Sequence, residues 1–139
     1  MGRTCDGEVR TMILLDANYV LRFLLRDNEE MYQIVRGLIS QEVCHIDNEV
    51  LVEVVFVLIK VYDVSRHTIR TSLGKTVALT NIRVEDEAVI LRALEIFDER
   101  NLDIVDAILC AKSTVHDVRT FDKKLNKCIR IFQENVEIG

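Results

Sequence analysis

The stretch Met12–Leu25, MILLDANYVLRFLL, decides the fold. Its short apolar run ends at Asp16, and apolar residues at helical spacing follow from Asn18. A buried strand that passes into a helix through a carboxylate places that carboxylate at the carboxyl edge of a sheet, where open α/β sheets bind their ligands. The other acids of the chain are therefore judged by whether the fold brings them to Asp16. Capping of the following helix is the alternative role for this residue.

Length and charge narrow the class of protein. The 139 residues, 49% of them hydrophobic, favour one globular domain, which we expect over residues 12–139, with residues 1–11 as a leader outside the fold. No apolar run approaches the ~18 residues that span a bilayer, so we expect no membrane association. A net charge of −5 argues against a protein that simply coats nucleic acid. A metal-dependent nuclease remains open, because bound cations invert the local charge of clustered carboxylates.

The four cysteines show no metal-binding pattern. Cys5, Cys44, Cys110 and Cys128 form no C-x-x-C pair and have no histidine at zinc spacing. We interpret them as reduced thiols of a cytoplasmic protein, the last three as small core residues.

Short strands alternate with helices along the chain, which predicts an α/β fold with a parallel sheet covered on both faces. The valine-rich stretch 49–62 is too long for an ordinary strand, so we expect a buried helix there. We expect the other helices at 29–39, 66–79 with Ser65 as its cap, 85–100 ending at Asn101, and from Asp103, and the other strands at 42–46, 82–84, 117–120 and 128–132.

Four further acids are candidates for the edge that holds Asp16. Glu53 lies inside VLVEVVFVL, where a carboxylate needs a partner or a metal unless it lies on a solvent-exposed stripe with Glu49 and Lys60. Asp103 and Asp106 open one helix, and capping is the expected role of Asp103. Asp122 follows the expected strand at 117–120, with helix capping again the alternative.

Carboxylates crowded at one edge repel one another unless cations intervene. Oxygen ligands suit Mg²⁺ or Mn²⁺ and do not suit zinc. Two such ions about 3.5–4 Å apart activate water and stabilise the leaving oxygen in phosphodiester cleavage.

At this point the sequence resembles the PIN-domain ribonucleases, and among them the VapC-type toxins of toxin–antitoxin pairs. The matching pieces, in family order, are LLDANYVLRFLL, VLVEVVFVL, LDIVDAILCAKS and VRTFDKKL. The resemblance implies a PIN-like three-layer α/β/α fold with a central parallel sheet of about five strands. It also implies that Asp16, Glu53, Asp106 and Asp122 are the catalytic, metal-binding acids, and that Asn18 and Thr120, with Asp103 beside them, support the site.

The resemblance further implies Mg²⁺-dependent (or Mn²⁺-dependent) cleavage of RNA in the cytoplasm, a cognate antitoxin and a homodimer. Basic residues near the acids are candidates for holding RNA phosphates, with an ordinary solvated helix face as the alternative: Arg22, Arg26, Lys112, Lys123 and Lys124. A second hypothesis is a regulatory or assembly module that keeps this fold and binds a partner without catalysis. Receiver-type phosphotransfer fits less well, because no acidic pair ends the first strand, and a haloacid-type phosphatase lacks its Asp-x-Asp at residues 16–18.

Overall fold

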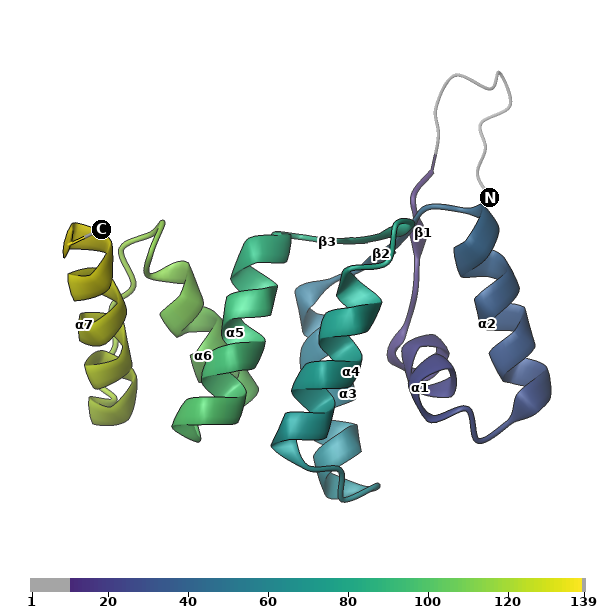
Figure 1. Ribbon diagram of the computed structural model, residues 1–139, viewed down its shortest axis with the longest axis horizontal. Helices are drawn as coiled ribbons and strands as arrows, with labels where there is room; N and C mark the ends of the chain where they lie inside the picture. The colour runs from purple at the N-terminus through teal and green to yellow at the C-terminus, as the bar shows by residue number, and fades with distance from the viewer. Residues whose placement is uncertain (1–10, 139) are drawn as a thin grey trace.

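The computed structural model describes residues 11–138. The leader expected over residues 1–11 therefore lies outside the described residues, except for residue 11. Helices and short strands alternate along the chain (Figure 1). The elements are β1 (Ile13–Leu14), α1 (Ala17–Leu25), α2 (Glu29–Gln41), β2 (Cys44–Ile46), α3 (Asn48–Lys60), α4 (Arg66–Val77), β3 (Ile82–Val84), α5 (Glu87–Arg100), α6 (Ile104–Lys112) and α7 (Lys123–Ile138). None of these helices is both long and apolar enough to cross a bilayer.

Polar side chains set most of the helix starts. Asn28, Ser65 and Asp86 each accept a hydrogen bond from the backbone amide three residues later, which satisfies one of the free amides of a helix end. The predicted cap at Ser65 is thereby confirmed. Asn101 ends α5 in the left-handed conformation, with φ at 56°, as its position in the sequence predicts.

The three strands form one parallel sheet in the order β1-β2-β3. Ile13 pairs with Cys44, and Cys44 pairs in turn with Ile82. The predicted parallel α/β fold is confirmed. Because the strands are parallel, the turns after their carboxyl ends share one edge of the sheet, and Asp16 lies in the first of these turns.

The expected sheet of about five strands is wrong, because the described residues form three. Residues 117–120 belong to neither a helix nor a strand. Residues 128–132 continue α7 instead of forming a strand, because Leu125, Cys128 and Ile129 recur at helical spacing and are buried on one face. In residues 128–132, CIRIF, apolar and charged residues partly alternate. This alternation resembles a strand pattern, although the residues belong to the helix.

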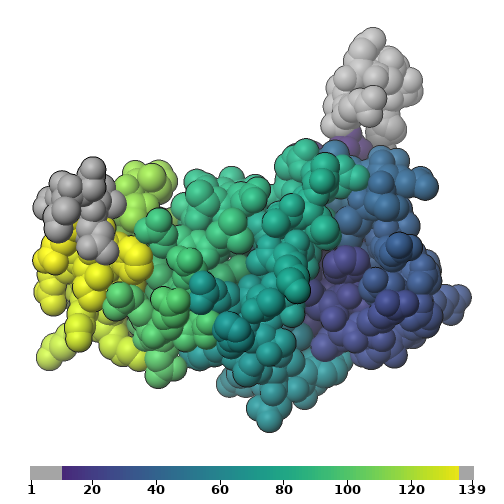
Figure 2. Space-filling model, viewed as in Figure 1, coloured from purple at the N-terminus to yellow at the C-terminus, as the bar shows by residue number. Residues whose placement is uncertain are grey.

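The helices continue the molecule away from the sheet. Figure 1 shows α1 and α2 at one end and α7 at the other, with α3, α4, α5 and α6 between them, and the space-filling view shows the same order from purple to yellow (Figure 2). The predicted helix at 49–62 is confirmed as α3, which buries Leu51, Val54, Val55 and Leu58.

An arginine connects α4 to the end of α5. The guanidinium of Arg66 donates to the carbonyl oxygens of Phe97 and Leu102, both at 2.6 Å, and lies 4.3 Å from the centre of the fully buried Phe97 ring. These contacts hold the turn between α5 and α6, so they also position the first residues of α6.

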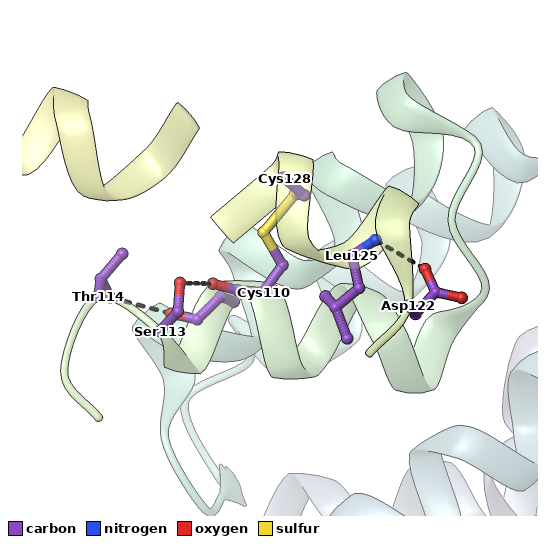
Figure 3. The surroundings of a disulfide bond; sticks show 7 residues. Cys110, Ser113, Thr114, Asp122, Leu125 and Cys128 are labelled. Carbon is purple, nitrogen blue, oxygen red and sulfur yellow. Dashed lines mark hydrogen bonds between the residues drawn. A yellow bond between two sulfur atoms is a disulfide. The ribbon is translucent and has the colours of Figure 1, made fainter. Parts of the chain in front are cut away.

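The prediction of reduced thiols is wrong for two of the cysteines. Cys110 of α6 and Cys128 of α7 form a disulfide, with their Cα atoms 6.2 Å apart (Figure 3). Cys44 remains a buried free thiol. Burial raises the pKa of this thiol, so it stays protonated. The prediction that these three cysteines lie in the core is confirmed. Sequence spacing alone gave no sign of the bond, because the cysteines meet only when α7 packs on α6.

We expect reduction of this disulfide to lower the free energy of unfolding by about 3 kcal/mol, the chain-entropy contribution of a loop of such length. The bridged cysteines are 18 residues apart in sequence. Urea titrations of the oxidised protein and of protein treated with a phosphine reductant measure the difference. Cys44→Ser, which alters only the buried free thiol, should respond to reductant as the wild type does. Superimposable wild-type titrations would contradict the bond.

Candidate functional site

Asp16 caps α1. Its Oδ1 accepts a hydrogen bond of 2.9 Å from the amide of Tyr19, so the capping role considered for this residue is confirmed. The residue is exposed, and within residues 11–138 its second carboxylate oxygen accepts no hydrogen bond. Capping therefore fixes the carboxylate at the sheet edge and leaves one oxygen free for a ligand.

Glu53 lies on the solvent-exposed side of α3. Glu49 and Lys60 are exposed with it, so the single chain shows the solvent stripe that the sequence left open as an alternative. Phe56, one turn further along, is 43% exposed although the neighbouring Val54 and Val55 are buried. This stripe thus combines an acid with a partly exposed apolar ring.

The second group of acids gathers where α6 and α7 begin. Asp103 caps α6 through a 2.8 Å hydrogen bond from the amide of Asp106, and Asp122 caps α7 through a 2.8 Å bond from the amide of Leu125 (Figure 3). Burial, and then the charges of Asp103 and Asp122, raise the pKa of Asp106 above its ordinary range, while Lys124 opposes the shift. Asp106 is therefore a partly buried acid with two anionic neighbours.

The structure does not bring all four predicted metal ligands together. Asp16 lies in the turn between β1 and α1, whereas Asp106 belongs to the first turn of α6 and Asp122 caps α7. Over residues 11–138 no group of three or more His, Cys, Asp or Glu side chains is arranged to hold a metal ion. The oxygen donors have the chemistry that Mg²⁺ requires, but the acids of one chain do not fit such an ion.

The supporting polar residues differ in their placement. Thr120 lies beside Asp122, because its Oγ1 accepts a 3.0 Å hydrogen bond from the Asp122 amide and its carbonyl accepts one of 2.8 Å from the Asn126 side chain. Asn18, in the first turn of α1, is exposed. Thr120 thus fixes the backbone immediately before Asp122.

The candidate RNA-binding residues are mostly engaged within the chain. Arg22 donates to Asp27 at 2.9 Å, and Arg26 forms a two-pronged contact with Glu29 at 3.0 Å for each bond. Lys124 donates to the carbonyl of Asn101 at 3.0 Å. Lys123 is exposed beside Asp122, and Lys112 is half-buried at the end of α6. Of the five, Lys123 is therefore the freest to meet a phosphate.

Two further residues were not singled out from the sequence. Phe121, immediately before Asp122, is fully exposed, which is unusual for a phenylalanine. Asn48, at the start of α3, donates to Glu85 across the carboxyl ends of β2 and β3, while its own side-chain oxygen is buried and lacks a hydrogen-bond partner in residues 11–138. A polar residue two positions after the end of β2 was the available signal for Asn48. Phe121 gave none beyond its position beside an acid.

Comparison with known proteins gives one match. A family model described as "PIN domain" matches residues 13–129. No curated protein and no solved structure matches the chain.

The raised pKa of Asp106 predicts a pH dependence of stability. Its folded pKa lies above the unfolded value, so the folded state binds more protons and loses stability as pH rises from the ordinary aspartate range through the folded pKa. We expect Asp106→Asn, studied in EDTA, to exceed the wild type in free energy of unfolding at pH 7 and to lose that advantage at acid pH.

Urea titrations across this pH range measure the effect. Asp117→Asn is the control of opposite sign, because Arg119 lowers the pKa of Asp117 and this substitution removes a stabilising charge at neutral pH. Parallel pH profiles for the wild type and Asp106→Asn would show that Asp106 has no raised pKa.

Proposed function

Because the chain belongs to the PIN-domain family, a family of nucleases, we propose that it is a Mg²⁺-dependent endoribonuclease (Mn²⁺ would serve in its place). We propose further that it is the toxin of a type II toxin–antitoxin pair. In this proposal it acts in the cytoplasm as a homodimer, and a cognate antitoxin controls it. Residues 12–139 would form its single catalytic domain.

One observation carries the proposal. The family match over residues 13–129 includes all four acids, Asp16, Glu53, Asp106 and Asp122, and two of them already influence each other at the start of α6 and α7. The side chains offer oxygen donors only, and PIN nucleases usually employ divalent metals that such donors bind. In residues 11–138 of one chain the acids do not gather around a position that an ion could occupy.

The substrate class follows from the family and the surface. A nuclease domain acts on nucleic acid, and the exposed Lys123 and the exposed ring of Phe121 flank Asp122. A cation holds phosphates and an aromatic face stacks on unpaired bases, so single-stranded RNA is the substrate that these neighbours favour.

A second function is supported by a different surface. Met31 and Ile34 on α2 are 44% and 56% exposed. Exposed apolar side chains at helical spacing are typical of a surface that binds another protein. In the alternative proposal this surface would act in a regulatory or assembly module without catalysis. In the toxin proposal it would be available to the antitoxin.

The test is RNA cleavage by the wild type, Asp16→Asn and Asp106→Asn in Mg²⁺ or Mn²⁺, with EDTA as the metal-free control. We expect each substitution to lower the cleavage rate by at least about a hundredfold, as the loss of a metal ligand does, and EDTA to abolish cleavage.

Asp86→Asn is the matched control. Asp86 also caps a helix, accepting from the Val89 amide at 3.2 Å, but it is not one of the four acids, so we expect full activity. Equal cleavage by all four proteins would refute the site. A wild type that cuts no RNA in either metal would favour the binding module.

A further inference from the structure

A cavity of about 220 Å³ lies between the end of α5 and the first half of α7. Buried Leu102 and Cys128 and half-buried Ile131 form the apolar part of its wall. Its volume is several times the roughly 30 Å³ that one water molecule occupies in the liquid, so it can hold a small organic molecule. The four acids of the proposed metal site do not line it.

Three positive charges meet at this cavity. Arg100, Lys124 and Lys127 line it, and none of them pairs with a carboxylate in the part of the chain whose side chains the structure describes. Glu99 also lines the cavity, but its carboxylate lies 3.0 Å from the guanidinium of Arg70 on α4, which offsets its charge. The whole chain carries a net charge of −5, so its composition does not predict such a concentration of unpaired cations. An anion bound among them would relieve their mutual repulsion.

Contacts between α5, α6 and α7 hold the walls of the cavity in place. Lys124 Nζ donates to the carbonyl of Asn101 at 3.0 Å, and the guanidinium of Arg100 lies 5.5 Å from the centre of the Phe132 ring. The disulfide, one of whose cysteines lines the cavity, fastens α7 to α6 (Figure 3). Because these contacts already order the walls, a ligand would cost little further ordering of the chain.

We propose that this cavity binds a small organic phosphate monoester. Such a group carries a charge of about −1.5 to −2 at pH 7, whereas a phosphate diester carries a single negative charge. Arg100, Lys124 and Lys127 together supply the positive charge and the N–H donors that a doubly charged phosphate requires. Leu102 and Ile131 give the organic part of the ligand an apolar surface to contact.

A free small molecule suits this cavity better than a nucleic-acid strand does. Proteins that hold a single strand carry a positively charged groove that follows several successive phosphates. The three cations instead converge on one hollow, whose wall also includes Glu99. One phosphate group is therefore the occupant that the cavity favours, and a terminal phosphate of RNA is the alternative source of such a group.

Isothermal titration calorimetry with phenyl phosphate and with its singly charged diester, methyl phenyl phosphate, tests the site. The buffer is cationic and freed of metals on a chelating resin, because EDTA and phosphate are themselves anions that would compete. We expect phenyl phosphate to bind and the diester to bind at least about tenfold more weakly, the effect of losing one charge-assisted contact. No binding of phenyl phosphate, or equal affinity for both esters, would overturn the proposal.

Lys127→Gln and Arg130→Gln form a matched pair of variants. Both residues are exposed on α7 and both substitutions remove one positive charge, but Arg130 does not line the cavity. We expect Lys127→Gln to weaken the binding of phenyl phosphate roughly tenfold and Arg130→Gln to leave it within about twofold of the wild type. Because both side chains are exposed, both variants should melt as the wild type does. Equal weakening in the two variants would show that only overall charge matters, and would overturn the site.

Oligonucleotides separate the two sources of a phosphate monoester. A short RNA with a 5′-phosphate and the same RNA with a 5′-hydroxyl are titrated in the same metal-free buffer, in which the proposed nuclease does not cut. Weaker binding of the 5′-phosphorylated RNA than of phenyl phosphate supports the small ligand. Tighter binding that requires both the 5′-phosphate and Lys127 would assign the cavity to RNA and overturn the small ligand. A wild type that cuts RNA but does not bind phenyl phosphate overturns the cavity site alone and leaves the nuclease standing.

Discussion

The structure depends on carboxylates that cap helices at the points where a strand or loop passes into a helix. Asp16, Asp103 and Asp122 each accept a hydrogen bond from the amide three residues later, at 2.9, 2.8 and 2.8 Å. A helix begins with unsatisfied amides, and an aspartate in this position satisfies one of them and complements the helix dipole. The same bond fixes the direction of the carboxylate and leaves its other oxygen available. Structural and functional roles of these acids are therefore compatible, and neither excludes the other.

A second constraint is repulsion between the acids. Burial and the neighbouring charges of Asp103 and Asp122 already raise the pKa of Asp106, so a further carboxylate at this place would cost stability without a cation. In residues 11–138 Asp16 lies in the turn between β1 and α1, and no three acids are arranged to hold an ion. Assembly of the four acids would thus require a cation to offset their repulsion.

Local sequence signals made several helix ends, and the helix at 49–62, predictable. Ser65, Asn101 and Asp103 mark helix ends whose chemistry lies within a few residues, and the length of 49–62 separated α3 from a strand. The acids were identified by residue type and position, but their distances were not, because these depend on how α5, α6 and α7 pack. The disulfide between Cys110 and Cys128 was missed for the same reason. The segment at 117–120 has the composition of a strand, yet a strand requires a partner, and the sequence does not say which edge provides one.

The central proposal is that the acids of this PIN-family chain bind a divalent metal ion, and the melting temperature of the protein with and without Mn²⁺ tests it most directly. The account predicts that Mn²⁺ raises the melting temperature of the wild type, since an ion bound only by the folded state stabilises that state. Asp122→Asn, which lacks one proposed ligand but keeps its helix cap, should show a smaller rise. An unchanged melting temperature of the wild type at millimolar Mn²⁺, or an equal rise in both proteins, would contradict the proposal.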